Sequence, residues 1–186
     1  KIYGWFKNMK NIFDSGFYKN HQLKKLPFKN IGKNVMISKN CLIIGVKNIS
    51  ILDNVRIDSF TSIIAEEGYL KIGKNVHIGG HGHILCSGGV IINNNCTISQ
   101  GVKIYSQSDD YSGNFEHGLF VKNNKSNYKK GKVNIGKHTI IGSGSVILPN
   151  ISIVNNSSIG ALTLVNKDIR IAGIYAGIPC KKIKKK

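Results

Sequence analysis

The sequence predicts an all-β solenoid, a parallel β-helix of about six coils. Its clearest evidence is a run of aliphatic residues at six-residue spacing, namely Ile135, Ile141, Ile147, Ile153, Ile159 and Val165. The same spacing recurs earlier in groups of three, whose first members are Ile31, Ile51, Ile72 and Ile92, so that successive groups start 20, 21 and 20 residues apart. Three hexapeptides form one coil, and each of these coils carries two or three extra residues, which we place at one corner.

Residue types beside the aliphatic positions support the same register. Side chains alternate along a strand, so the aliphatic residue and the residue two before it face inward. The second inward positions are small or β-branched: Val76, Cys96, Thr139 and Ser157 in one column, and Cys41, Thr61, Gly82, Val102, Ser145 and Thr163 in another. The corner three residues after the first aliphatic position carries Asn34, Asn54, Asn75, Asn95, His138 and Asn156. We expect a left-handed backbone there, because asparagine tolerates it.

Residues 1–26 lack the six-residue spacing and predict a short helical, basic N-terminal cap. The segment mixes lysines with Trp5, Phe6, Ile12, Phe13 and Phe17 in a helix-like pattern. Covering the open strand edges of the first coil is the favoured role, and weak association with an anionic membrane surface is the alternative. No stretch resembles a membrane span or a signal-peptide core. The prism is expected over residues 27–171, and residues 172–186 form a tail that folds along it.

Cysteine usage indicates a reduced, cytoplasmic and metal-free protein. Cys41 and Cys96 fall in inner columns, Cys86 is placed in a corner insertion, and Cys180 is in the tail. None of these residues forms a CxxC pair.

The charge points to anionic partners. The chain has 27 basic and 9 acidic residues, for a net charge of +18. All the basic residues except Arg56 and Arg170 are lysines, whereas proteins that read nucleic-acid bases rely on the bidentate fork of arginine. We therefore expect no nucleic acid, and phosphate-bearing small molecules become the better candidates.

The regular spacing is interrupted once, between Ile104 and Ile135, where 31 residues replace about 20. Insertions in solenoids often carry function. The extruded loop is placed at residues 105–132, and it concentrates the acidic residues Asp109, Asp110 and Glu116 near His117. A functional site is favoured there over a solvated excursion.

The last coils and the tail, IGSGSVILPNISIVNNSSIGALTLVNKDI followed by YAGIPCKKIK, resemble the C-terminal part of the hexapeptide-repeat acyltransferases. Those enzymes are left-handed β-helices that use acetyl-CoA, and the resemblance covers roughly residues 17–186. The segments NVHIGG and IYSQSDDYSGN are similar to a subgroup that acetylates nucleotide-linked 4-amino-4,6-dideoxy sugars for surface polysaccharide and lipopolysaccharide biosynthesis.

The resemblance also implies an assembly and a donor site. Family members are homotrimers whose sites lie between adjacent prisms, with CoA along the last coils. By motif match, the residues that would line the CoA path are Ser143, Ala161, Asn166 and Lys167, and those that would meet its phosphates are Lys181 and Lys184.

Three residues are candidates for catalysis: His81, Asp109 and His117. Many family members carry a histidine where the motif match places Asp109. A carboxylate is a weak base for a sugar hydroxyl but can orient an ammonium group and accept its proton, so an amine acceptor is favoured. His81 is placed at a corner one rung from the loop exit, and His117 lies in the loop.

Two further histidines, His77 and His83, are predicted to point outward, where a partner subunit could use them. A metal site formed by them with His81 is disfavoured, because outward positions on different faces do not converge. The alternative functions are an O-acetyltransferase of capsule or lipopolysaccharide sugars, and a non-catalytic or carbonic-anhydrase-like β-helix.

Overall fold

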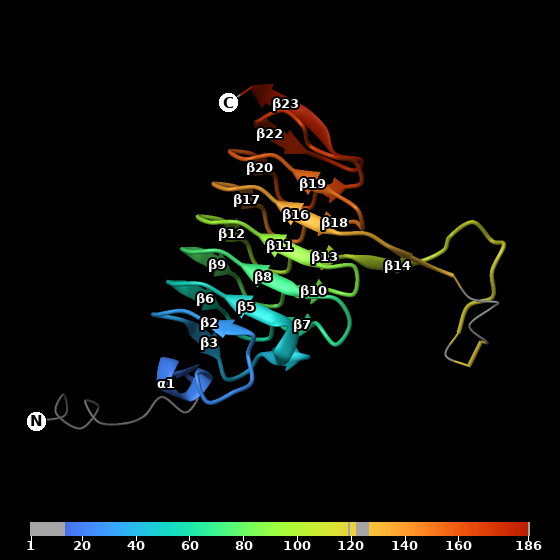
Figure 1. The fold of residues 1–186 in the computed structure, drawn as a ribbon. Helices are drawn as coiled ribbons and strands as arrows, with labels where there is room; N and C mark the ends of the chain where they lie inside the picture. The colour runs from blue at the N-terminus through green and yellow to red at the C-terminus, as the bar shows by residue number, and fades with distance from the viewer. Residues whose placement is uncertain (1–13, 119, 122–126, 186) are drawn as a thin grey trace, which may run out of the picture.

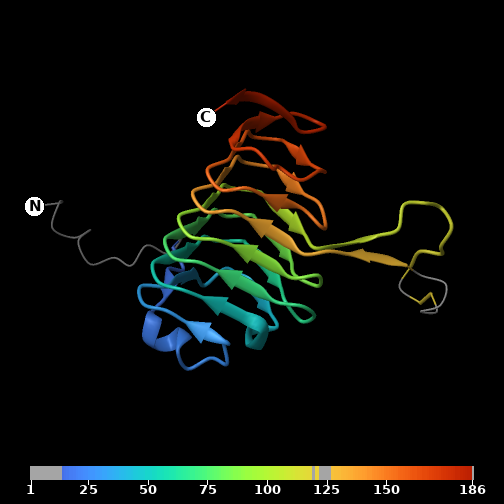
Figure 2. The same ribbon diagram turned by 45° about the horizontal axis from the view of Figure 1, so that its top comes forward.

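The computed structural model describes residues 14–118, 120–121 and 127–185, and they form a three-sided prism of stacked coils (Figures 1 and 2). Each coil passes through three parallel sheets in turn, which we call faces 1, 2 and 3 in chain order. The fold matches the predicted parallel β-helix, and nearly all of its regular structure is strand.

Each face stacks one short strand from every coil. Face 1 contains β2 (Asn30–Ile31), β5 (Ile49–Ile51), β8 (Leu70–Ile72), β11 (Val90–Ile92), β16 (Val133–Ile135) and β19 (Ser152–Ile153). Face 2 contains β3 (Met36–Ser38), β6 (Val55–Ile57), β9 (Val76–Ile78), β12 (Thr97–Ile98), β17 (Ile140–Ile141), β20 (Ser158–Ile159) and β22 (Gly173–Ala176). Face 3 contains β4 (Leu42–Ile44), β7 (Ser62–Ile64), β10 (His83–Leu85), β13 (Lys103–Tyr105), β18 (Val146–Ile147) and β21 (Leu164–Val165).

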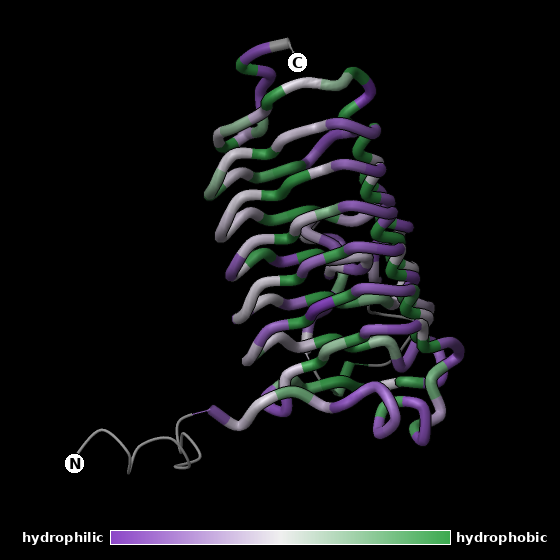
Figure 3. Tube along the Cα trace, turned by 90° about the vertical axis from the view of Figure 1, so that its left-hand side faces the viewer, coloured by the Kyte–Doolittle hydropathy of each residue, from purple (hydrophilic) through white to green (hydrophobic). Residues whose placement is uncertain are grey.

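The predicted register is confirmed on all three faces. Ile51 pairs with Ile72, Ile72 with Ile92, and Ile92 with Ile135, so each aliphatic residue stacks on its equivalent one coil away. These side chains fill the interior and are almost completely buried. A fully buried isoleucine contributes about 1.5–3 kcal/mol relative to an exposed one. Figure 3 shows hydrophobic segments recurring at the same places from coil to coil.

The predicted corner column is confirmed as well, between faces 1 and 2. Its members have φ values of 54° to 59°: Asn34, Asn54, Asn75, Asn95, His138 and Asn156. The first four also form a ladder in which each side-chain amide nitrogen donates to the amide oxygen in the next coil, at 3.1, 3.0 and 2.9 Å. The asparagines therefore supply both the turn geometry and a link between coils.

The extra residues of the early coils lie at the corner between faces 3 and 1, where a short 3₁₀ turn, η2 (Val46–Asn48), follows β4. The extruded loop leaves from this same corner, after β13, and returns into β16. Its base is an antiparallel ribbon of β14 (Gln107–Asp109) and β15 (Tyr128–Lys130) that projects from the prism, and we call residues 106–131 the arm (Figures 1 and 2).

Cys86 lies, as predicted, in the corner segment between β10 and β11, but it is not exposed there. Cys86 comes two residues after the inward-facing Ile84, so its side chain still points into the prism, where it is fully buried. Burial raises the pKa of this thiol to about 12.

The described part of the N-terminal cap, residues 14–26, contains one short strand and one short helix. Strand β1 (Phe17–Tyr18) adds antiparallel to β3, and helix α1 (Asn20–Leu23) buries Leu23 against the first coil. The side chain of Asn20 donates to the carbonyl of Gly32 and accepts from the backbone N–H of Val35, each at 3.0 Å. Trp5, Phe6, Ile12 and Phe13, on which the helical and membrane-surface predictions rest, lie outside the described residues.

The tail closes the other end. Ile169 bridges to Ile153, and β22 pairs parallel with β20, so a seventh, partial coil follows the six predicted ones. Strand β23 (Lys181–Lys185) then turns back and pairs antiparallel with β22. The tail thus forms an antiparallel hairpin that extends the face 2 sheet at the last coil. Across the described residues, no helix is long and apolar enough to cross a membrane.

Candidate functional site

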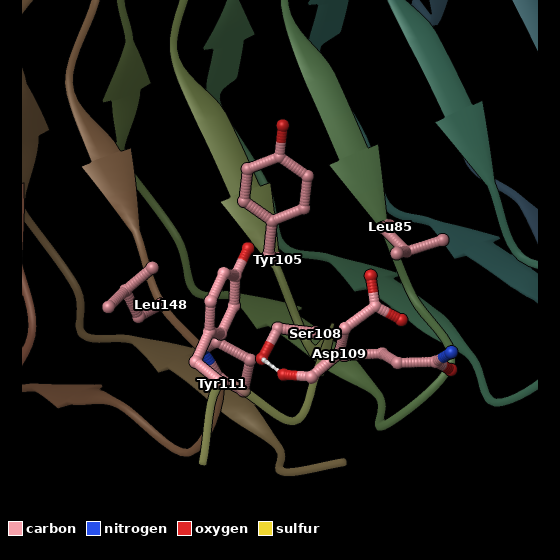
Figure 4. A pocket seen from close by; sticks show the side chains of 8 residues that line it. Leu85, Tyr105, Ser108, Asp109, Tyr111 and Leu148 are labelled. Atoms are coloured by element: carbon pink, nitrogen blue, oxygen red, sulfur yellow. Dashed lines mark hydrogen bonds between the residues drawn. The ribbon is translucent and has the colours of Figure 1, made fainter. Parts of the chain in front are cut away.

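A cavity of about 490 Å³ lies where the base of the arm meets face 3. The prism supplies Leu85, Tyr105, Leu148 and Pro149, and the arm supplies Gln107, Ser108, Asp109 and Tyr111. In Figure 4, Tyr105, Asp109 and Tyr111 extend to the same side, with Leu85 and Leu148 flanking them. The cavity therefore combines one carboxylate with aromatic and aliphatic walls.

The two adjacent aspartates of the arm differ in their environments. Asp109 is exposed and lines the cavity, and no described residue pairs with its carboxylate. The Asp110 carboxylate is buried and accepts hydrogen bonds from the Ser112 backbone N–H at 2.7 Å and from the Asn127 amide at 2.9 Å. Hydrogen bonds from Ser112, with Lys129 nearby, hold the pKa of Asp110 below its usual range. Asp110 therefore closes the arm, while Asp109 is available to a substrate.

Gln107 is a second polar residue of the arm that lines this cavity. It lies two residues before Asp109 on β14, so both side chains project from the same side of the ribbon. Its amide oxygen is buried and has no hydrogen-bond partner among the described residues.

His81 lies at a different corner from Asp109. It occupies the predicted corner position, with φ 58°, but that corner joins faces 2 and 3, whereas the arm leaves between faces 3 and 1. Its exposed ring stacks on Phe60 at 5.0 Å between centroids. Face 3 therefore separates His81 from Asp109 within one chain.

Three other histidines, His77, His83 and His117, do not line the cavity, but the His83 ring lies 5.5 Å, between centroids, from the ring of the lining residue Tyr105. His77 points outward from face 2, where its Nε2 contacts Asp58 Oδ2 at 2.7 Å. His83 is half-buried on the outside of face 3, with Nδ1 2.6 Å from the hydroxyl of Ser62. Burial, with Lys103 as a second cause, lowers the pKa of His83. His117 is exposed in the outer part of the arm.

The residues assigned to the CoA path fall into two groups. Ser143 and Ala161 are exposed on successive coils at the corner between faces 2 and 3, and the Leu162 backbone N–H donates to the Ser143 carbonyl at 2.9 Å. His81 lies on this corner too, two coils earlier. Asn166 and Lys167 lie at the other side of face 3, beside a second hollow that shares Pro149 with the main cavity.

Lys181 and Lys184 project from the same side of β23 although they are three residues apart. Lys184 pairs with Ile174 and Lys181 with Ala176, and the register shifts between these two pairs. Ile174 and Ala176 lie two apart on β22, so they point outward together while Tyr175 packs on the core. The irregularity thereby directs both exposed lysines to the outer surface of face 2.

No group of three potential metal ligands occurs among the described histidine, cysteine and acidic residues. The three clustered histidines of the sequence point from two faces and one corner, as their spacing predicts.

Comparison with known proteins identifies the family. No protein-family model matches the chain. The chain is 41% identical over 162 residues to a dTDP-4-amino-4,6-dideoxy-D-glucose acyltransferase of Escherichia coli, a match that covers 87% of this chain and 84% of that enzyme. The chain belongs to the hexapeptide-repeat acyltransferases. The protein described here is also 32% identical over 117 residues to the galactoside O-acetyltransferase of E. coli. That match covers 62% of this chain and 57% of the galactoside enzyme.

Solved structures give the same relationship. The N-acyltransferase AntD from Bacillus cereus, in complex with dTDP and 3-hydroxybutyryl-CoA, superposes on this acyltransferase with a TM-score of 0.85 and 38% identity over 93% of this chain and 90% of that one. A variant of AntD in complex with dTDP-4-amino-4,6-dideoxyglucose and coenzyme A gives a TM-score of 0.87 at 37% identity, with 93% and 91% coverage. An acetyl-CoA complex of a Vibrio cholerae hexapeptide-repeat acetyltransferase, at 15% identity, shares the fold.

Sequence reasoning missed the prism side of the cavity in this acyltransferase. Leu85, Tyr105 and Leu148 are outward positions at the ends of face 3 strands, where polar residues are the norm for a solvated sheet. Large apolar residues at three successive outward positions were the available signal.

Proposed function

We propose that this chain transfers an acetyl group from acetyl-CoA to the 4-amino group of a dTDP-linked 4-amino-4,6-dideoxy sugar. The observation that carries the proposal is the cavity with Asp109, whose carboxylate has no partner among the described residues, in a chain closely similar to enzymes that bind CoA and a dTDP-linked amino sugar. An acceptor amine is protonated near neutral pH, so a carboxylate without a partner suits it.

In the proposed reaction, Asp109 accepts a hydrogen bond from the sugar ammonium group and takes up the proton that nitrogen must lose. The amine nitrogen then attacks the thioester carbonyl carbon and loses a second proton as the tetrahedral intermediate collapses. The C–S bond breaks, the leaving CoA thiolate takes up that second proton, and Asp109 releases the first to solvent. The products are an amide and free CoA. Most of the rate enhancement would come from holding the two substrates together.

The donor is proposed to use the polar positions near the C-terminal end. Ser143 and Ala161 offer backbone and small side chains along one corner, and Lys181 and Lys184 present two ammonium groups on the adjoining face. Lysine ammonium groups are suitable point charges for the phosphates of CoA.

We also propose a homotrimer. Face 3 exposes Leu42 and Ile44 and carries the half-buried Leu85 and Leu148 in the same outer surface. Ser143 and Ala161 at one corner of face 3 and Asp109 at the other are separated within one chain, whereas neighbouring prisms that pack through this face would bring the two corners together. We place the reaction in the cytoplasm, and its product in surface polysaccharide biosynthesis.

The direct test mixes the purified protein with acetyl-CoA and dTDP-4-amino-4,6-dideoxyglucose and follows release of free thiol. We expect a product heavier by one acetyl group that survives mild alkali, as an amide does. An alkali-labile product would identify an ester and favour O-acetylation, the reaction named for the galactoside relative. Absence of thiol release with this acceptor would contradict the proposal.

A further inference from the structure

The carboxylate of Asp109 faces an apolar wall built from three successive coils. Leu85 pairs with Tyr105 across β10 and β13, and the next pair along, Ile104 with Ile147, places Leu148 beside Tyr105. Neighbouring strands lie about 4.8 Å apart, so these three side chains form a continuous strip about 10 Å long. Pro149 extends the strip at the end near Leu148.

This strip continues an apolar outward column of face 3, in which Ile44 pairs with Ile64 and Ile64 with Leu85. Of this column, Leu85, Tyr105 and Leu148 are the members that line the cavity. All three are half-buried beneath the arm. A free carboxylate beside an aliphatic and aromatic surface fits a ligand that carries an amine and an apolar group close together.

From this arrangement we infer that Leu85 and Leu148 select the 6-methyl group of the acceptor sugar. The inference rests on the proposed function. In a 4-amino-4,6-dideoxy sugar the amine on C4 and the methyl group on C5 are substituents of neighbouring carbons. With the amine on Asp109, the methyl group lies within reach of the leucines, and the C–H face of the sugar ring covers Tyr105.

The same geometry disfavours a sugar with a hydroxyl group on C6. That hydroxyl would be placed against leucine side chains, which offer it no hydrogen-bond partner. Apolar pockets reject an analogue that adds a hydroxyl by about 10²-fold at most, so the expected discrimination is about 10- to 100-fold in kcat/KM.

The test compares dTDP-4-amino-4,6-dideoxyglucose with dTDP-4-amino-4-deoxyglucose as acceptors at saturating acetyl-CoA. The purified wild-type protein should have a kcat/KM about 10- to 100-fold higher for the 6-deoxy sugar. Leu148→Asn and Leu85→Asn should each lower this ratio several-fold, mainly by slowing the 6-deoxy sugar. Leu148→Met, which keeps an apolar side chain of similar size, should retain it.

Leu52→Asn is the matched control, because Leu52 is an exposed leucine of the prism that does not line the cavity. The ratio of kcat/KM values for the two sugars should be the same in this variant as in the wild type. The KM for acetyl-CoA and the melting temperature are measured for every variant. Wild-type values of both show that a changed ratio reflects lost selection of the sugar and not lost folding.

The two proposals fail in different ways. Equal use of both sugars by the wild type, which needs no variant, overturns the inference and leaves the amine acyltransferase intact. An unchanged ratio in both folded asparagine variants overturns it as well. If neither sugar is acetylated, the proposed function itself is wrong.

Discussion

Asp109 and Asp110 show how neighbouring residues of one type acquire different roles. Both lie at the base of the arm, but their side chains point to opposite sides because β14 is extended. One side faces the cavity and the other faces the turn closed by Ser112 and Asn127. The direction of the side chain, which follows from strand register, decides which carboxylate can meet a substrate.

Replacing Asp109 by asparagine should therefore damage catalysis selectively. The amide keeps the shape of the side chain but cannot accept a proton, so we expect kcat to fall by about 10²–10⁴-fold. The KM for acetyl-CoA and the melting temperature should stay close to wild type. Steady-state kinetics at pH 7 measure this, and a loss of kcat below about threefold would remove Asp109 as the group that receives the amine proton.

His81 tests the competing assignment. His81→Asn preserves the left-handed corner, because asparagine tolerates positive φ better than most residues. We expect unchanged or slightly higher thermal stability and a loss of kcat below about tenfold, since the His81 ring stacks on Phe60 and the amine proton is assigned to Asp109. A loss as large as that of Asp109→Asn would instead make His81 the base, with the partner subunit supplying the contact.

The arm is an element whose position depends on Asp110. The lowered pKa means that ionised Asp110 stabilises the arm at pH values above the ordinary aspartate value of about 3.9. This stabilisation is lost as pH falls through the lower value of the folded state. The arm should thus loosen only in acid, before the prism does.

Asp110→Asn reproduces that loss at neutral pH, because the amide no longer carries the charge that Ser112, Asn127 and Lys129 surround. We expect faster proteolytic cleavage within the arm at pH 7 and a raised KM for the sugar, with a prism that melts normally. Wild-type cleavage rates in this variant would contradict the structural role of Asp110.

The tail hairpin carries a prediction of its own. Lys181→Ala with Lys184→Ala should raise the KM for acetyl-CoA several-fold, and the remaining donor affinity should depend less on salt. Lys182→Ala on the same strand is the control, since Lys182 pairs with Tyr175 and lies over its ring on the opposite side. Equal KM values in the wild type and the double variant would show that these lysines do not meet the donor.

Sequence periodicity predicts the coils well and the additions to them poorly. The isoleucine columns and the positive-φ asparagines follow from a repeat in which every coil imposes the same geometry on the next. Strands β1 and β23 and the ribbon of the arm leave no periodic signal in the sequence. Strands β1 and β23 each form by pairing antiparallel with a strand of the prism, and β14 and β15 form by pairing with each other. For the same reason, Asp109 could be proposed from a motif, while the leucine strip beside it required the register of three coils.

At the scale of the whole molecule, assembly is the main prediction. The apolar outer surface of face 3 and the separation of the donor and acceptor corners both favour three prisms around a common axis. Light scattering should give about three times the chain mass of 20.4 kDa. A monomer at micromolar concentration would exclude a site shared between subunits, and Leu42→Lys should weaken the assembly if face 3 is the interface.

The antiparallel strands β1 and β23 occupy the two ends of the same nine-stranded sheet. A stack of identical parallel rungs would otherwise present, at each end, an edge that another molecule could continue, and such molecules would join end to end into filaments. A strand running in the reverse direction no longer offers the hydrogen-bond pattern that the next parallel rung requires. On face 2, growth along the axis is thereby terminated within one chain, and lateral contact between prisms remains as the route to assembly.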